Sequence, residues 1–157
     1  MCQTTDMKIH IGSDHAGLEF KSKIIKHLEK GGHQVIDHGP HQYDALDDYP
    51  TFCIPAAQAT ALDPSSFGIV LGGSGNGEQM AANKVAGVRA ALVWSVETAK
   101  LAREHNNANV ISIGGRMHDE QFCLQLVDTF LATPFTNDER HVRRISQISK
   151  FEKEGKL

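Results

Sequence analysis

The glycine-rich segment at residues 72–77 is followed directly by a carboxylate. The segment reads GGSGNG, and the next residue is Glu78. Backbone N–H groups at such a turn form a positive pocket for an oxyanion, either a phosphate or a charge that develops during reaction. A carboxylate beside the pocket suits carbon-acid chemistry, in which a base removes a proton next to a carbonyl and N–H groups hold the enediolate oxygen. The alternative is that Glu78 only stabilises the first turn of a helix.

The same segment lacks the spacing of two common nucleotide-binding motifs. It contains neither GxGxxG nor the GKS or GKT ending of a P-loop. The sequence leaves the basicity of Glu78 open, because a helix start lowers the pKa of a carboxylate whereas exclusion of water raises it.

A second group of polar residues lies in GSDHAG, residues 12–17, at the end of the first predicted strand. The turn after the first strand is a common ligand site in open α/β sheets, and it carries an acid, Asp14, and an imidazole, His15. Ser13 or Asp14 could instead cap a helix and do nothing more. The adjacent histidine favours a functional interpretation of the pair.

A third candidate is the turn REHNNANV, which contains His105 and Asn106 before the fifth predicted strand. An imidazole there could act as an acid or a base near neutral pH. A histidine at a helix end can also serve only as a partner of the helix dipole. We expect this turn to lie at the same edge of the sheet as His15.

The last candidate residues are three arginines. Arg116 follows the fifth predicted strand, and Arg140 and Arg144 are four residues apart in the C-terminal segment. Residues four apart share a helical face, as two guanidinium groups that bind one phosphate require. A solvated basic face is the alternative interpretation of these arginines.

These residues are positioned by an alternation of strands and helices. Apolar runs with little alternation predict strands that are covered on both faces, and amphipathic patterns predict helices between them. The predicted strands are 7–12, 33–39, 68–73, 88–94 and 109–115, and the predicted helices include 17–30, 96–105, 119–132 and one that starts near Glu78. Right-handed crossovers then give a doubly wound, three-layer α/β domain with a Rossmann-like, five-stranded parallel sheet. The irregular segment 38–50, which contains Tyr43, has the length of a functional loop.

Composition limits the possible functions. We expect one domain over residues 1–157, with a flexible start at 1–6 and a polar C-terminal helix in 137–157 that faces solvent or a partner subunit. A net charge of −3 and few basic residues argue against nucleic acid and membrane surfaces as partners. Three distant cysteines and no apolar run of spanning length indicate a cytoplasmic protein.

The five motifs GSDHAG, GGSGNGEQMAANK, AREHNNANV, GGRMH and RHVRRI together resemble the type B ribose-5-phosphate isomerases, a family that includes galactose-6-phosphate isomerase. The resemblance covers about residues 7 to 152 and keeps the order of the motifs. Many family members carry a cysteine base where this sequence has Gly72. The sequence resembles the branch in which the glutamate after the loop takes that role.

The resemblance implies an interconversion of ribose 5-phosphate and ribulose 5-phosphate in the pentose phosphate pathway. It implies that Glu78 moves the proton between C1 and C2, and that Asp14 and His105 open the furanose ring. It also places a catalytic serine and the sugar-binding residues at Gly73, Ser74, Gly75, Asn76, Gly77 and Asn106. The phosphate would be held by His15, Arg116, Arg140 and Arg144, the last two from the neighbouring subunit of a homodimer.

No cofactor is implied, and no catalytic metal is expected, because backbone N–H groups can hold the oxyanion. The acids in HDE at 118–120 and YDALDD at 43–48 are interpreted as loop acids. Two alternatives stay open: an isomerase of a six-carbon sugar phosphate such as allose 6-phosphate or galactose 6-phosphate, and a non-catalytic sugar-phosphate binding module on the same scaffold.

Overall fold

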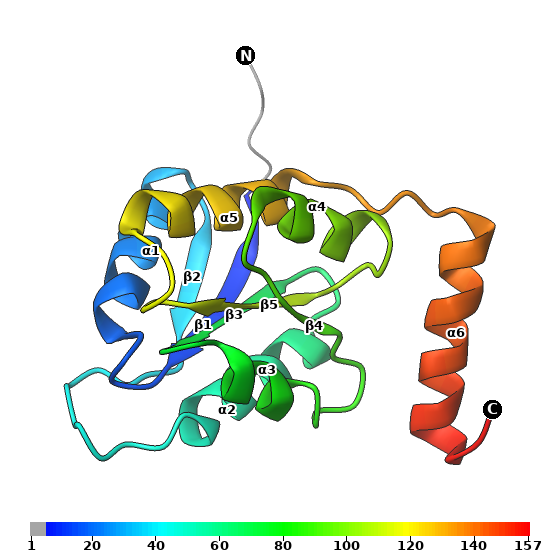
Figure 1. Ribbon diagram of the computed structural model, residues 1–157, viewed down its shortest axis with the longest axis horizontal. Helices are drawn as coiled ribbons and strands as arrows, with labels where there is room; N and C mark the ends of the chain where they lie inside the picture. The colour runs from blue at the N-terminus through cyan, green and yellow to red at the C-terminus, as the bar shows by residue number, and fades with distance from the viewer. Residues whose placement is uncertain (1–5) are drawn as a thin grey trace.

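The computed structural model describes residues 6–157, which form a five-stranded parallel sheet with helices on both faces (Figure 1). The sheet order is β2-β1-β3-β5-β4. The strands are β1 (Lys8–Ser13), β2 (Gln34–Asp37), β3 (Phe67–Gly72), β4 (Ala90–Leu92) and β5 (Val110–Gly114). The helices are α1 (Leu18–Lys30), α2 (Pro50–Leu62), α3 (Asn76–Ala82), α4 (Val96–Glu104), α5 (Glu120–Ala132) and α6 (Glu139–Glu154).

Each face of the sheet has its own apolar core. The larger core packs α1, α4 and α5 against β1, β3 and β5, with Ile24, Leu126 and Phe130 fully buried. The smaller core packs the small side chains of α2 and α3, such as Ala56 and Ala82, against the opposite face. The result is the expected three-layer, doubly wound arrangement.

The parallel register brings the carboxyl ends of the strands to one edge. Ser13 at the end of β1 pairs with Leu71, and Gly72 at the end of β3 pairs with Gly114 at the end of β5. We call this side of the sheet the carboxyl edge, and the side where the strands begin the amino edge. All strand-to-helix turns open at the carboxyl edge, because every strand runs in the same direction.

The five predicted strands are confirmed, and so are the predicted helices that became α1, α3, α4 and α5. Residues 38–49 form no helix or strand, as expected, and α2 then begins at Pro50. The predicted flexible start lies outside the described residues, apart from Asp6. Within residues 6–157, no helix is both long and apolar enough to cross a membrane.

Helix α6 stands beside the body of the molecule, at the end of an extended linker (Figure 1). Its first turn contacts the body, where the rings of His141 and His105 stack at 4.3 Å between centroids. Farther along, the backbone N–H of Gly87 donates to the carboxylate of Glu152 at 3.0 Å. A cavity of about 670 Å³ lies between these contacts and is lined by residues of β4 and by Ile148 of α6.

Candidate active site

Three turns are hydrogen-bonded to one another at the carboxyl edge. The backbone N–H of Asp14 donates to the carbonyl of Leu71 at 3.3 Å, which joins the first turn to the end of β3. The N–H groups of Gly115 and Arg116 donate to the carbonyls of Gly72 and Gly73 at 2.8 and 3.1 Å. The structure therefore brings the GSDHAG, glycine-rich and GGRMH motifs together, as the predicted sheet topology requires.

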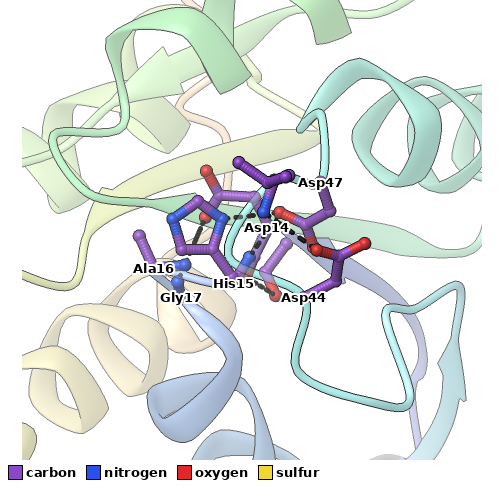
Figure 2. A network of polar contacts seen from close by, with 8 residues as sticks. Asp14, His15, Ala16, Gly17, Asp44 and Asp47 are labelled. Atoms are coloured by element: carbon purple, nitrogen blue, oxygen red, sulfur yellow. Dashed lines mark hydrogen bonds and ion pairs between the residues drawn. The ribbon is translucent and has the colours of Figure 1, made fainter.

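Asp14 is buried at the start of the first turn, with 8% of its surface exposed. Its Oδ1 accepts hydrogen bonds from the backbone N–H groups of Ala16 at 2.9 Å and Gly17 at 3.2 Å (Figure 2). These bonds fix the carboxylate and satisfy two donors at the entry to α1. The N-cap of α1 is Gly17, which has no side-chain oxygen to cap the helix, so Asp14 closes the turn before the helix and does not cap it. The same bonds hold the carboxylate at the carboxyl edge.

The glycine-rich loop is shaped by one left-handed residue and one buried hydroxyl. Gly75 has φ of +82°, a conformation that favours glycine, and its carbonyl accepts a 2.6 Å hydrogen bond from the buried Ser112 hydroxyl. Ser74 and Asn76 are exposed on the loop, and the Asn76 side-chain amide donates to the Ser74 hydroxyl at 3.2 Å. The loop therefore presents a hydroxyl and an amide outward from a fixed backbone.

Glu78 points back into the space above the end of β3, and only 4% of its surface is exposed. A Cβ atom on Gly72 would clash with the Glu78 carboxylate, whose Oε2 would be only 2.8 Å away. Any side chain at residue 72 would thus displace this carboxylate. The absence of a side chain at position 72 and the buried carboxylate at position 78 depend on each other.

Burial raises the pKa of the Glu78 carboxyl above its usual value, and the nearby Asp14 carboxylate raises it further. Backbone N–H groups of Glu78 and Gly75 act in the opposite direction but do not outweigh burial. Exclusion of water therefore outweighs the helix start in setting the pKa of Glu78, which makes the carboxylate a stronger base. A carboxylate with a raised pKa is better matched to proton abstraction near neutral pH.

The Cys53 thiol is fully buried close to these carboxylates. Burial raises its pKa far above the usual range, and Glu78, Asp14 and Asp47 add to the effect. The thiol therefore stays protonated at neutral pH and is unsuited to act as a base.

Asp47, one of the acids expected to be only loop acids, contacts the first turn from the 38–49 loop. Its Oδ1 accepts hydrogen bonds from His15 Nδ1 at 2.6 Å and from the His15 backbone N–H at 3.0 Å (Figure 2). The Tyr43 ring packs edge-on against the imidazole, with 5.9 Å between centroids. The loop's unusual length was the available signal, but its sequence did not single out Asp47.

Asp14, His15 and Asp47 bring three potential metal-ligating atoms within 4.8 Å of one another. Within the described residues, His15 Nδ1 and Asp47 Oδ1 bind each other, and Asp14 Oδ1 accepts two backbone N–H groups. The residues of this cluster therefore already satisfy much of one another's hydrogen-bonding capacity.

A buried lysine holds the other end of the same loop. Lys21 is 1% exposed, and its Nζ donates to Asp37 Oδ1 at 2.7 Å and to the carbonyl of Pro40 at 2.6 Å. Asp37 Oδ1 also accepts the backbone N–H of Gly39 at 2.9 Å. The 38–49 loop is thus fixed where it leaves β2 and again where Asp47 meets His15.

Arg116 and Tyr49 border the glycine-rich loop on two sides. A Cβ on Gly73 would lie 3.5 Å from the Arg116 side chain, and a Cβ on Gly77 would lie 2.6 Å from the Tyr49 ring. Arg116 is exposed, so its guanidinium is available to an anion near the first turn. Glycine at position 77 allows the Tyr49 ring to approach the loop backbone, whereas a Cβ on Gly73 would be in ordinary van der Waals contact with Arg116.

The turn with His105 and Asn106 lies at the amino edge, opposite the residues described above. It enters β5 at Val110, which pairs with the first residues of β4 and with Gly68 near the start of β3. The expectation that both histidine turns share one edge was wrong. The physical reason is that a helix-to-strand turn opens at the edge where parallel strands begin.

The His105 turn is packed against the start of α6. His141 is buried and stacks on the His105 ring at an interplanar angle of 16°, and Arg140 and Arg144 are exposed on the same helix. Burial lowers the pKa of His141, with further lowering from His105 and Arg140. Neutral His141 can therefore stack on the His105 ring without repulsion between two positive charges.

Arg103 ties this turn to the linker that leads to α6. Its Nη1 donates to the Ala108 carbonyl at 2.6 Å and to Asn107 Oδ1 at 2.8 Å, and its Nε donates to the Thr133 carbonyl at 3.3 Å. The guanidinium also lies 4.9 Å from the Phe67 ring centroid. One buried cation thus connects the turn, the linker and the core.

The candidate residues form two separate sets within one chain. We call the first set the carboxyl half-site, which comprises Asp14, His15, Gly73, Ser74, Gly75, Asn76, Gly77, Glu78 and Arg116. We call the second set the amino half-site, which comprises His105, Asn106, Arg140 and Arg144.

Comparison with known proteins identifies the family. The ribose/galactose isomerase family model matches residues 9–148. A ribose-5-phosphate isomerase B from Mycolicibacterium paratuberculosis is 61% identical over 94% of this chain and 92% of its own length. The crystal structure of ribose-5-phosphate isomerase B from Mycoplasma genitalium with bound ribulose-5-phosphate aligns with a TM-score of 0.91 at 44% identity, over 94% of this chain and 97% of that one. This chain therefore belongs to the ribose/galactose isomerase family.

Proposed function

We propose that this protein is an aldose–ketose isomerase that interconverts ribose 5-phosphate and ribulose 5-phosphate in the pentose phosphate pathway. The observation that carries the proposal is the buried Glu78 carboxylate, seated over Gly72 beside the glycine-rich loop. The relatives at 58% to 61% identity are named ribose-5-phosphate isomerase B, and the Mycoplasma genitalium structure contains the ketose product.

In the proposed reaction, Glu78 removes a proton from C2 of the open-chain aldose and returns it to C1 of the enediolate, while the proton of the O2 hydroxyl passes to O1. One carboxylate can perform both transfers if both carbons lie on the same side of it, within hydrogen-bond reach. The Ser74 hydroxyl and the backbone N–H groups of the loop hold the oxygen on which negative charge develops. The raised pKa of Glu78 suits this role, because the base must accept a proton and release it again within one cycle.

Ring opening needs a second proton-transfer pair, for which we propose Asp14 as the base and His105 as the donor to the ring oxygen. These two residues lie at opposite edges of the sheet in one chain. A donor must come within hydrogen-bond reach of the substrate, so His105 must come from another chain. We therefore propose a homodimer in which the amino half-site of each chain completes the carboxyl half-site of its partner.

The surface of α6 is consistent with such a dimer. Val142, Ile148 and Phe151 are apolar residues of this helix with 39%, 54% and 56% of their surface exposed. An apolar helix face beside an open cavity of this size is suited to burial against a second copy of the chain. Arg140 and Arg144 would then join His15 and Arg116 around the phosphate, while Asn106 binds a sugar hydroxyl.

We further propose that residues 1–157 act as one isomerase domain in the cytoplasm. The thiols of Cys53 and Cys123 are buried and unpaired, which is typical of proteins kept in a reducing compartment.

The proposal is tested by proton NMR of the metal-stripped protein with ribose 5-phosphate in heavy water. We expect ribulose 5-phosphate to form, with deuterium entering at the carbon that exchanges its proton. Glu78→Gln is the matched control and should form ketose at least about a hundredfold more slowly. A folded wild-type protein that leaves ribose 5-phosphate unchanged but converts allose 6-phosphate would contradict the five-carbon substrate. Binding of both sugars without turnover would contradict the isomerase.

A further inference from the structure

The contact between Asp47 and His15 joins the 38–49 loop to the carboxyl half-site. The Asp47 side chain is 8% exposed, and its Oδ1 accepts both the backbone N–H and the ring Nδ1 of His15, at 3.0 and 2.6 Å. A carboxylate can only accept hydrogen bonds, so the ring must carry its proton on Nδ1. One carboxylate oxygen thus fixes the position of the His15 backbone and the orientation of its ring.

This orientation leaves the other ring nitrogen free. Within the described residues, His15 Nε2 makes no hydrogen bond, and the His15 side chain is 23% exposed. Tyr43 packs edge-on against the ring from the same loop and limits its rotation. The imidazole is therefore held on one side by the loop and presents its second nitrogen to a ligand.

The contacts with His15 satisfy only one oxygen of the Asp47 carboxylate. The second oxygen of Asp47, Oδ2, is buried and has no hydrogen-bond partner among the described residues. A buried acceptor without a partner costs free energy, which offsets part of the stability gained from the two hydrogen bonds of Oδ1. The cost is understandable if Asp47 acts through His15 on a bound substrate.

We propose that Asp47 is a positioning residue for substrate binding, which orients His15 Nε2 towards the phosphate group of the sugar. This inference rests on the proposed function, in which His15 is one of the phosphate ligands. The ring donates Nδ1–H to Asp47, and in its doubly protonated form it also offers Nε2–H as a charge-assisted donor to a phosphate oxygen. The pair of carboxylate and imidazole would act as one unit, in the way that outer carboxylates orient ligating histidines in other sites.

The loop can hold Asp47 in place because it is fixed at both ends. Buried Lys21 binds Asp37 and the carbonyl of Pro40 at the start of the loop, at 2.7 and 2.6 Å. Asp47 lies near the other end, three residues before α2 begins at Pro50. The position of His15 thus depends on contacts that begin more than twenty residues away in the sequence.

The experiment compares steady-state kinetics of wild type, Asp47→Ala, Asp47→Asn and the matched control Asp44→Ala. Asp44 is an exposed carboxylate of the same loop, and its Oδ1 accepts only the backbone N–H of Leu46, at 2.9 Å. We expect Asp47→Ala to raise KM for ribose 5-phosphate about tenfold or more, as loss of a hydrogen bond to a charged group does, with little change in kcat. Asp47→Asn should recover most of the affinity, since its amide oxygen can accept the same two hydrogen bonds. Asp44→Ala should behave as wild type.

Two further readouts separate positioning from a structural role. The inhibition constant of inorganic phosphate should rise in Asp47→Ala together with KM, and adding His15→Ala should produce little further increase, because the two residues act as a unit. In nitrogen NMR of the histidine rings, Asp47→Ala should change the signals of His15 and leave those of the other histidines unchanged.

The outcomes distinguish this inference from the proposed function. If wild type turns over ribose 5-phosphate and Asp47→Ala keeps its KM and its phosphate affinity, the role of Asp47 is refuted while the isomerase stands. The same holds if KM rises but phosphate inhibition does not change. If wild type itself shows no turnover, the proposed function fails, and unaltered phosphate binding in Asp47→Ala then also refutes the positioning role.

Discussion

The carboxylate of Glu78 occupies the space that a side chain on Gly72 would need. The two residues lie on different elements, at the end of β3 and in the first turn of α3, and a Cβ at position 72 would clash with the carboxylate. The resemblance placed a cysteine base at position 72 in many relatives. In this chain that base and the glutamate would require the same volume, so only one of them can be accommodated.

Replacing the base should separate activity from stability. We expect Glu78→Gln to lower kcat by at least about a hundredfold, the range associated with loss of a general base. The same variant should melt at a higher temperature at neutral pH. The folded-state pKa of Glu78 is raised, so the ionised form is disfavoured on folding, and the stability available at low pH is lost as pH rises through that pKa. Glutamine does not ionise, so the variant avoids this loss of stability. The melting temperatures of variant and wild type at pH 5 and pH 8 measure the difference, and equal values at pH 8 would contradict the prediction.

The shared volume predicts coupling between the two positions. Gly72→Ala should destabilise the protein and lower kcat, because the new methyl group displaces the Glu78 carboxylate. In the double variant with Glu78→Ala, the steric part of the destabilisation should disappear. Urea denaturation of the wild type, both single variants and the double variant gives the interaction energy. Additive effects would show that the two residues do not compete for space.

The pH dependence of kcat/KM should report the raised pKa of Glu78. Activity requires the ionised carboxylate, so we expect the acidic limb of the profile to lie above the ordinary value of 4.5 for a glutamate. The Asp14 carboxylate contributes to raising this pKa, and Asp14→Asn should therefore move the limb to lower pH. The measurement is the position of the limb and not the rate, because Asp14 also has a proposed role in ring opening. A limb that stays in place would show that the Asp14 carboxylate does not contribute to this pKa.

Mixing two inactive variants tests where the proton donor comes from. Glu78→Gln and His105→Asn should each be inactive, but a mixed dimer contains one site with both wild-type residues if they come from different chains. After complete subunit exchange, about half of the dimers are mixed, and the activity should approach about a quarter of wild type. If both residues act from the same chain, no activity returns. Arg144→Ala mixed with Glu78→Gln should show the same recovery.

A histidine pair away from both half-sites should make the fold sensitive to acid. His10 Nδ1 and His38 Nε2 are 2.9 Å apart, so one ring must donate and the other accept. Burial lowers both pKa values, and His38 lowers that of His10 further. Groups with depressed folded-state values stabilise the protein above the unfolded value of 6.5, and this contribution is lost as pH falls through the folded values. We expect urea stability to decline below about pH 6.5 and His10→Leu to weaken that decline.

The sequence predicted the sheet well because its strands are short apolar runs bounded by glycine or polar residues. Residues 67–72, which form β3, are buried along almost their whole length, and the local pattern is sufficient to identify such a strand. Helix α2 gave no comparable signal. It is apolar on most sides and contains Pro55, so its helical structure depends on burial against the sheet and not on an amphipathic pattern.

The site was predicted in its residue types but not in its arrangement. Glycines 72 to 77 and Glu78 could be singled out because the motif is contiguous. Asp47 could not, because its role arises from the path of an irregular loop, which no periodic pattern records. The edge occupied by His105 follows from topology alone, since a turn from helix to strand opens where parallel strands begin.

The buried guanidinium of Arg103 connects the turn that contains His105 to the linker that leads to α6. It binds the carbonyl of Ala108 beside the histidine turn and the carbonyl of Thr133 at the start of the linker to α6. His141 in the first turn of α6 stacks on His105, so a shift of the helix would be transmitted to the His105 ring. In an isomerase assembled as proposed, the geometry of subunit contact would set the geometry of proton transfer, and an incorrectly seated partner would be catalytically silent even with every reactive group intact.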